Sequence, residues 1–187
     1  MAFGPGQFRA ALTGGGARPT LFEVTMAFPV AAPDPAASTK MTFTCEAASL
    51  PSDTVGSIIL PYFGRQTKWP GDRVFEDWNV TIINDEDFLV KKAFERWLSA
   101  LNSHNGNLRS QAAATTAGFG VDAYIKQYGK TGDSIKGYRF IGMFPTAITP
   151  IEVGWAATDQ IERFSVTLSY QWWESDTTDG QGDGLNG

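Results

Sequence analysis

Alternation of apolar and small polar residues over short segments is the feature that most limits what this chain can fold into. It is clearest in residues 161–173, where the apolar positions are Phe164, Val166, Leu168, Tyr170 and Trp172. Successive side chains of a β-strand point to opposite faces of its sheet. The segment therefore predicts a long strand with one face on a core and the other, made of Ser, Thr and Gln, facing water.

The same period of two recurs along most of the chain. Further strands are predicted at residues 21–30, 41–47, 54–63, 74–83, 121–129 and 134–144. Gly129–Asp133 predicts a hairpin turn between the last two of these strands. The proline-rich residues 31–38 and the turn-rich residues 64–73 predict loops, and residues 107–120 a mobile loop.

One segment, residues 85–103, has a helical period instead. Val90, Phe94, Trp97, Leu98 and Leu101 recur on one face, and acidic residues crowd the first turn after a cap at Asn84 or Asp85. The predicted fold class is therefore mainly β with one flanking α-helix. Two packed antiparallel sheets would form a small barrel or sandwich.

The composition fits one packed domain. The chain has 187 residues, of which 42% are hydrophobic and 13% aromatic. We expect an N-terminal arm (1–20), a main domain (21–173) and a flexible Gly/Asp-rich tail (174–187). The tail holds four acidic residues and no basic one, which leaves 15 basic against 16 acidic residues elsewhere. A body so close to neutral argues against tight non-specific nucleic-acid binding.

Residues able to carry catalysis are scarce. Cys45 is the only cysteine and His104 the only histidine, which excludes an intramolecular disulfide and an ordinary zinc site. Asp85 and Asp87 are explained as helix-capping charges, and the acidic tail lacks the spacing of a calcium loop. No signal peptide or membrane span is recognisable. We therefore expect a protein that is not an enzyme, has no cofactor or metal, and does not insert into a membrane.

Specific phrases, in a fixed order over residues 8–173, carry a resemblance. They are TCEAASLP (44–51), PYFGR (61–65), PGDRVFEDW (70–78), INDEDF (83–88), FERW (94–97) and FPT (144–146), followed by Ile151 and FSVT (164–167). In these phrases the chain resembles the tail tube proteins of contractile-tailed bacteriophages. The tail from Glu174 onward is not part of that pattern.

The resemblance implies a structural subunit of the inner tail tube, six copies of which form a ring. Rings stack into a conduit for genome ejection, so the subunit's first partner is itself. The other implied partners are the tail sheath, the baseplate and tail terminator proteins, and double-stranded DNA in transient passage. The implied location is the virion, after assembly in the cytoplasm of the bacterial host.

Two sets of residues are predicted to serve this role. The parity opposite the core residues assigns the lumen face to Thr42, Thr44, Glu46, Ser165, Thr167, Ser169 and Gln171. The arm and the loop after residue 60 predict the subunit and ring contacts Phe3, Phe8, Leu12, Tyr62, Arg65, Trp69, Asp72 and Arg73. A small, mostly uncharged lumen face suits a polyanion that has to slide without being held.

Two alternatives remain open at this point. One is the related tube of a tailocin, an extracellular contractile injection system or a type VI secretion machine, which delivers protein effectors. The other is a monomeric β-sandwich binding module, in which Trp69, Trp172 and Trp173 would be stacking platforms. Tubes or stacked rings in electron micrographs of the purified protein would distinguish the first class from the second.

Overall fold

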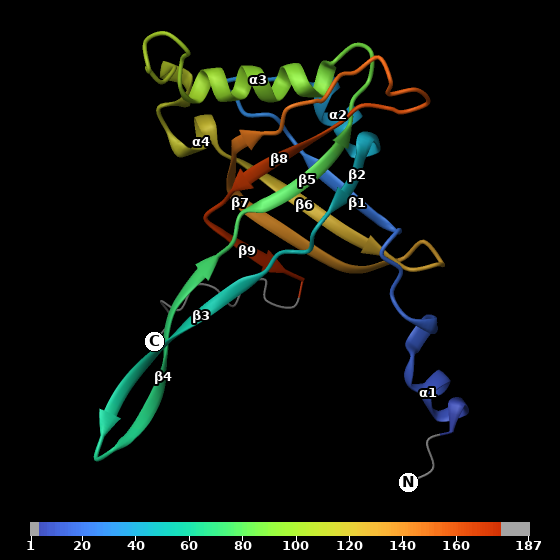
Figure 1. Ribbon diagram of the computed structural model, residues 1–187, viewed down its shortest axis with the longest axis vertical. Coiled ribbons are helices and arrows are strands. Elements are labelled where there is room, and N and C mark those ends of the chain that lie inside the picture. Colours follow the sequence, from blue (N-terminus) through green and yellow to red (C-terminus); the bar gives the residue numbers. More distant parts are fainter. Residues whose placement is uncertain (1–3, 177–187) are drawn as a thin grey trace.

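Antiparallel strands form the centre of the molecule in the computed structural model, which describes residues 4–176 (Figure 1). The strands are β1 Phe22–Met26, β2 Cys45–Ala48, β3 Asp53–Tyr62, β4 Arg65–Phe75, β5 Trp78–Ile83, β6 Val121–Tyr128, β7 Ser134–Ile148, β8 Arg163–Ser169 and β9 Trp172–Ser175. The helices are α1 Pro5–Ala11, α2 Pro35–Thr44, α3 Leu89–Leu101 and the single turn α4 Thr116–Phe119. The prediction of a mainly-β antiparallel fold is confirmed.

One sheet of seven strands follows the order β1-β6-β7-β8-β5-β2, with β9 also paired to β7. Strand β7 belongs to both halves of this sheet, because it pairs with β6 and β9 in its first part and with β8 from Phe144 onward. The change of partner occurs beside Gly142, whose φ of 64° is accessible to glycine at little cost. Glycine at this position lets the strand bend and fold one half of the sheet over the other.

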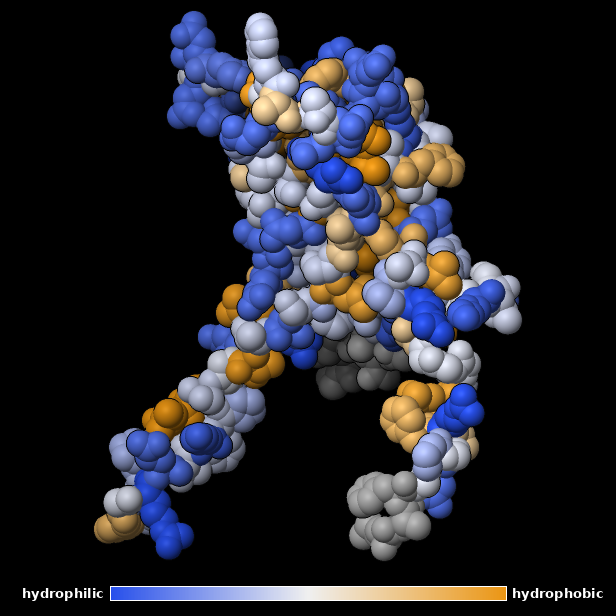
Figure 2. All heavy atoms as spheres, turned by 45° about the vertical axis from the view of Figure 1, so that its right-hand side comes forward, coloured by the Kyte–Doolittle hydropathy of each residue, from blue (hydrophilic) through white to orange (hydrophobic). Residues whose placement is uncertain are grey.

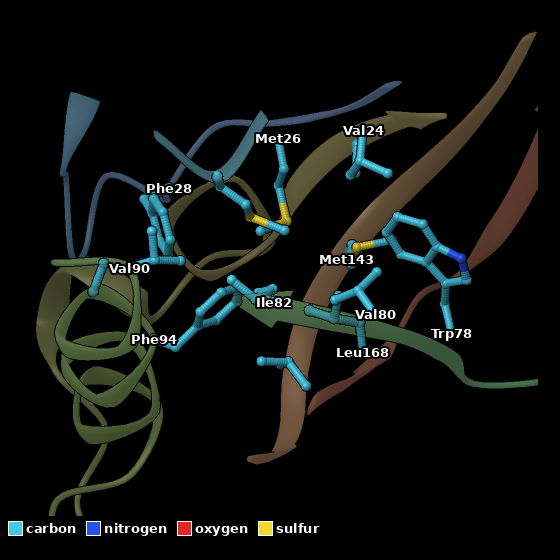
Figure 3. Packing of buried hydrophobic residues seen from close by; sticks show 14 of the residues in the cluster. Val24, Met26, Phe28, Trp78, Val80, Ile82, Val90, Phe94, Met143 and Leu168 are labelled. Atoms are coloured by element: carbon cyan, nitrogen blue, oxygen red, sulfur yellow. The ribbon is translucent and has the colours of Figure 1, made fainter. Parts of the chain in front are cut away.

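The core lies between the two halves and is closed by α3 (Figure 3). Val24 and Met26 of β1 face Val80 and Ile82 of β5, and all four are at most 2% exposed. Across the same space, the Trp78 ring stacks on the Phe140 ring with 4.3 Å between centroids. The alternation read from the sequence therefore places apolar residues on the core face, as predicted for β1, β5 and β8.

Helix α3 is the predicted amphipathic helix, but it is shorter than expected. It spans Leu89–Leu101 rather than residues 85–103. Phe88, with a φ of 53°, occupies the N-cap position, and Asp87 Oδ1 accepts a hydrogen bond from Leu89 N at 2.9 Å. The three acidic residues before it thus form a turn that precedes the helix. On the core side, Trp97 is fully buried and its Nε1 donates to Phe119 O at 2.9 Å.

Helix α2 begins at Pro35, so residues 31–34 form a loop as predicted, but the loop predicted for 35–38 and the strand predicted for 41–44 are wrong. Asp34 Oδ1 caps the helix by accepting from Ala37 N at 2.9 Å, and Pro35 occupies the first helical position. Proline is well tolerated there because that residue's N–H has no partner within the helix. Only residues 45–48, in β2, are extended.

Strand β4 replaces the loop predicted at residues 64–73, so that prediction is also wrong. Pro70 and Gly71 favoured a turn in the sequence, yet Pro70 pairs with Ser57 of β3. Strand β4 pairs only with β3, so its other edge has no strand beside it. Proline, which lacks an N–H, is tolerated at such an edge because no interstrand hydrogen bond is lost there. The real turn is Phe63–Gly64, between Tyr62 and Arg65.

Smaller differences concern the ends of the chain and residues 107–120. The arm contains α1 and a 3-10 turn at Thr13–Gly15, and residues 107–120 contain a 3-10 turn and α4. The long strand predicted at 161–173 is divided into β8 and β9 by a bend after Ser169. Strand β9 continues to Ser175, two residues into the predicted tail, and residues 177–187 of that tail lie outside the described part of the chain.

Candidate assembly surfaces

The β3–β4 hairpin extends away from the body of the molecule (Figure 1). None of its residues from Asp53 to Phe75 is buried. Large apolar side chains are nevertheless exposed along it: Val55, Ile58, Ile59, Leu60, Tyr62, Phe63, Trp69 and Val74 are 48–90% exposed. Figure 2 shows orange, hydrophobic patches along this projection at the lower left. A surface of this kind is typical of a protein–protein contact.

The far end of the hairpin is basic as well as apolar. We call residues 60–69 the hairpin tip; it contains Arg65 and Lys68 and no acidic residue. Neither cation forms an ion pair with any residue of 4–176. Nearer the body, Arg73 pairs with Asp53 at 3.1 Å. The hairpin tip therefore presents uncompensated positive charge beside exposed aromatic rings.

The turn of the hairpin contains a bulky residue in an unfavourable conformation. Phe63 has a φ of 44° and is 90% exposed, and Gly64 follows with a φ of 78°. Two-residue hairpin turns with positive φ at both positions favour Asn-Gly, and a bulky aromatic residue there is strained. The Phe63 ring packs edge-on against the neighbouring Tyr62 ring, with 4.5 Å between the centroids.

The N-terminal arm is the second exposed apolar segment. Helix α1 buries no residue, and Phe8 and Leu12 are 68% and 40% exposed. An isolated seven-residue helix is unstable in water without a partner surface. Phe3, the third apolar residue predicted for contacts, lies outside the described residues.

The third surface is a polar face on the outside of β5, β7 and β8. We call it the hydroxyl face; it consists of Asn79, Thr81, Thr146, Ser165, Thr167 and Ser169. Its side chains bond to one another and to the backbone: Thr81 Oγ1 lies 3.0 Å from Ser165 Oγ, and Thr167 Oγ1 donates to Asn79 Oδ1 at 2.8 Å. Because most of these polar groups already have partners and none carries a charge, the face offers little to hold a passing anion.

The structure separates the residues that the sequence grouped as one polar face. Ser165, Thr167 and Ser169 lie together on β8, opposite its core residues. Thr42 and Thr44 do not share this geometry, since they lie on α2 and their hydroxyls donate to Ser38 O and Lys40 O. The strand parity that placed them on that face was wrong.

Two further members of the predicted set lie at the margins of the sheet. Glu46 is in β2 and pairs with Arg163 Nε at 2.5 Å, while Gln171 lies in the bend between β8 and β9. The sequence reasoning also missed Asn79, Thr81 and Thr146. The first two could have been found from the parity of β5, where they alternate with Trp78, Val80 and Ile82.

Charged groups tie α2 to α3 and to the turn before it. Lys40 Nζ lies 2.5 Å from both Asp85 Oδ2 and Asp87 Oδ2. The hydrogen bonds from Lys40 lower the pKa of both carboxyl groups below their ordinary value. Arg96 of α3 pairs with the capping residue Asp34. These groups have structural partners and need no catalytic explanation.

No site for chemistry emerges from the described residues. Burial raises the pKa of the Cys45 thiol to about 12, which keeps it protonated and unreactive near neutral pH. Within residues 4–176, no three His, Cys, Asp or Glu side chains are grouped closely enough to hold a metal ion. None of the helices in that range has the length and apolar character needed to cross a bilayer.

A hollow of about 500 Å³ beside the end of α3 is also unsuited to acid–base chemistry. It is lined by Leu98, Leu101, Asn102, Asn107, Arg109, Phe119, Phe144, Pro145 and Thr146. None of these is a carboxylate, histidine or cysteine, and the Arg109 guanidinium stacks over the Phe119 ring at 5.4 Å. Carboxylates, histidine and cysteine are common proton donors and acceptors near neutral pH, and this hollow has none of them.

The tryptophans do not form the flat platform that a carbohydrate-binding module would use. Trp69 is on the hairpin, whereas Trp172 and Trp173 are consecutive residues of β9 and point to opposite faces. Trp172 is 45% exposed, but Trp173 is half-buried and packs edge-on against the Tyr138 ring at 5.7 Å. This arrangement disfavours the monomeric binding module.

Comparison with known sequences gives a consistent assignment. A family model described as "Phage tail tube protein" matches residues 17–176. Tail tube protein gp19 of Enterobacteria phage T4 is 29% identical over 167 residues, which cover 89% of this chain and 96% of the T4 protein. A tail tube protein of Serratia phage KSP90 is 25% identical over 166 residues, covering 88% and 92% of the two chains.

Solved structures share the fold at low sequence identity. A chain in the baseplate of the anti-feeding prophage, 6-fold symmetrised, has a TM-score of 0.63 and 14% identity, with coverage of 85% of this chain and 94% of that one. A chain in the sheath–tube complex of the PVC extracellular contractile injection system, in its extended state, has a TM-score of 0.54 and 15% identity, with coverage of 93% and 98%. These likenesses concern the fold alone.

Proposed function

The chain belongs to the phage tail tube protein family and is a structural component of a contractile-tailed phage virion, and we propose that it polymerises as stacked hexameric rings into the inner conduit of the tail. The resemblance recognised in the sequence phrases is thereby confirmed. The sixfold ring is supported by the 6-fold symmetrised assembly that holds a chain of the same fold. Its further partners in this proposal are the sheath, the baseplate and the tail terminator.

The observation that carries the proposal is the exposed apolar hairpin. Ile58, Leu60 and Phe63 are each at least 53% exposed on a two-stranded projection that has no core of its own. In a dispersed monomer this surface would be an aggregation hazard. In a polymer it is covered by neighbouring copies, and Tyr62, Arg65, Trp69, Asp72 and Arg73 lie on the same projection. The α1 arm with Phe8 and Leu12 gains a partner surface in the same way.

The hydroxyl face is the proposed lumen surface. Ser165, Thr167 and Ser169 are small and uncharged, and the only arginine of β8, Arg163, is neutralised by Glu46. Each unpaired cation on a conduit wall would bind phosphate and retard double-stranded DNA. A wall of hydrogen-bonded, uncharged hydroxyls would not retard DNA in this way, which suits transient, non-specific passage of the genome. Assembly in the host cytoplasm is part of the same proposal.

Electron microscopy of the purified protein tests the assembly. We expect tubes or stacked rings with sixfold symmetry in end views, and loss of these particles when the hairpin residues Val55–Arg73 are replaced by a Gly-Gly turn. The shortened protein should remain folded by circular dichroism, because the hairpin contributes no buried residue. A wild-type protein that stays monomeric up to millimolar concentration would contradict the proposal.

Charge added to the lumen tests the conduit separately. In phage particles that carry Thr167→Lys together with Ser169→Lys, we expect slower genome ejection, with the delay growing as the salt concentration is lowered. The matched control is Lys at Thr116, an exposed residue at the start of α4 that is not part of the hydroxyl face. Unchanged ejection kinetics in assembled particles of the double variant would remove the lumen assignment but leave the tube intact.

A further inference from the structure

A third exposed apolar segment lies at the other end of the molecule from the hairpin. It is the β7–β8 connection, residues 149–162, which we call the end loop. None of its residues is buried, and its Trp155 is fully exposed, with Val153 at 81% and Ile161 at 62%. So exposed a tryptophan is unusual, since Trp side chains are largely buried on average. Exposed Trp is enriched at the energetic centres of protein interfaces.

The end loop is negatively charged, whereas the hairpin tip is positively charged. It contains Glu152, Asp159 and Glu162 and no basic residue. Glu162 accepts a hydrogen bond from Asn84 Nδ2 at 2.8 Å, whereas Glu152 and Asp159 form no ion pair with any residue of 4–176. Exposed apolar groups beside unpaired acids thus face one way, and exposed aromatic groups beside unpaired Arg65 and Lys68 face the other.

The placement of the two segments prevents them from meeting within one subunit. In Figure 1 the longest axis of the molecule is vertical; the hairpin tip lies at the bottom and the end loop at the top, beside the start of α3. Each hairpin strand of ten or eleven residues reaches roughly 33 Å at ~3.3 Å per residue. Two different complementary patches at opposite ends form a heterologous, head-to-tail contact when copies stack in one direction.

We propose that the end loop is the receiving surface for the hairpin tip of a second copy of this chain in the next ring, with Trp155 packing against the tip's aromatic side chains and Glu152 and Asp159 facing Arg65 and Lys68. The inference rests on the proposed ring stacking and adds the partner surface, which lies outside the residues predicted from the sequence. Both members are projections, so the contact forms without rearrangement of the core.

Charge exchange provides the test. Glu152→Lys and Lys68→Glu are made singly and together, and the critical concentration for tube formation is measured by sedimentation and electron microscopy. We expect each single change to raise the critical concentration ~10-fold or more, and the double change to return it to within about threefold of wild type. Asp133→Lys, the same charge change at an exposed turn between β6 and β7, is the matched control and should have no effect.

The aromatic part of the contact has its own variants. Trp155→Ala should weaken assembly at least as strongly as Glu152→Lys, and Trp155→Phe should restore part of it. The apolar control Leu108→Ala removes a side chain that is 71% exposed elsewhere and should leave assembly unchanged. Because all these sites are exposed, the monomers should keep their wild-type thermal midpoints, which separates lost assembly from lost folding.

Each other outcome overturns a defined statement. Wild-type tubes together with normal assembly of Trp155→Ala and Glu152→Lys would overturn this inference alone. A double variant no better than its single parents would do the same, as would normal Trp155→Ala tubes that fail to take up the sheath, since the end loop would then serve the sheath. Absence of tubes from the wild type would overturn the proposed function as well.

Discussion

The body of the subunit and its β3–β4 hairpin are built from similar residues but hold them in opposite ways. In the body, Trp78 and Phe140 are at most 1% exposed and stacked on each other. In the hairpin, Ile58 and Trp69 are 53% and 57% exposed and have only the neighbouring strand beside them. Apolar content alone therefore does not distinguish a core strand from an exposed strand. The two kinds of strand differ in whether another part of the chain packs on their apolar face.

This difference separates folding from assembly. A two-stranded hairpin is at best marginally stable in water, whereas a sheet folded over a shared core is independently stable. The body should thus carry nearly all of the monomer's free energy of unfolding, whereas the hairpin should contribute little to it and serve polymerisation instead. The following changes test that division, ordered by their expected effect on the free energy of unfolding.

Removing a core aromatic should have the largest effect. Trp78→Ala deletes a fully buried ring and should lower the free energy of unfolding by about 3–5 kcal/mol, measured by urea denaturation of the monomer. The paired change Trp69→Ala in the hairpin should alter it by less than ~0.5 kcal/mol but impair tube formation. Comparable losses of stability at the two sites would show that the hairpin belongs to the folding unit.

Removing the cap of α2 should have an intermediate effect. Asp34→Ala deletes the acceptor for Ala37 N and the partner of Arg96, and should cost about 1–2 kcal/mol by urea denaturation. Asp34→Asn keeps a capping acceptor without the charge and should recover most of this loss. Equal stability of the Asp34→Ala and wild-type proteins would mean that α2 contributes little to the body.

Relieving the hairpin turn should have a small and local effect. Phe63→Asn places a residue suited to positive φ before Gly64, so hydrogen exchange at hairpin amides should slow while the global free energy of unfolding changes by less than about 1 kcal/mol. Assembly should weaken in the same variant, because the exposed ring is lost. Faster exchange in the hairpin would show that Phe63 stabilises the turn through the monomer's own contacts.

The smallest effect concerns the exposed charges between α2 and α3. Lys40 lowers the folded-state pKa of Asp85 and Asp87, so their contribution is present above the ordinary carboxyl pKa of ~3.9 and is lost as pH falls through the lowered values. The thermal midpoint of Lys40→Gln should therefore lie slightly below that of wild type at pH 6 and coincide with it near pH 2. A difference that persists at pH 2 would assign the loss to packing of the lysine stem.

The sequence predicted the elements whose partners are inside the subunit. Val24, Val80 and Val166 alternate with polar neighbours because each strand has one face on the core. Strand β4 escaped prediction because it packs on nothing: Pro70 and Gly71 favour a turn locally, and only pairing with β3 overrides them. Helix α2 escaped because its apolar residues have little periodicity, although Asp34 followed by Pro35 is a recognisable helix start.

The candidate site was predictable to a similar degree. Tyr62, Arg65 and Trp69 were assigned to contacts as loop residues, and the structure places them on one exposed hairpin. Their assignment to subunit or ring contacts, like that of Ser165, Thr167 and Ser169 to the lumen, stays a prediction. The end loop was not anticipated, because an exposed Trp155 leaves no signature until the burial of its side chain is known.

The position of the hairpin and the end loop at opposite poles has a consequence for size. A head-to-tail contact that does not close into a ring produces an open polymer. Whatever its length, such a polymer has a free hairpin at one end and a free end loop at the other. No feature of such a subunit limits the number of copies in the polymer. The extent of the polymer must then be measured by a separate component, and the two extremities, chemically unlike each other, require different caps.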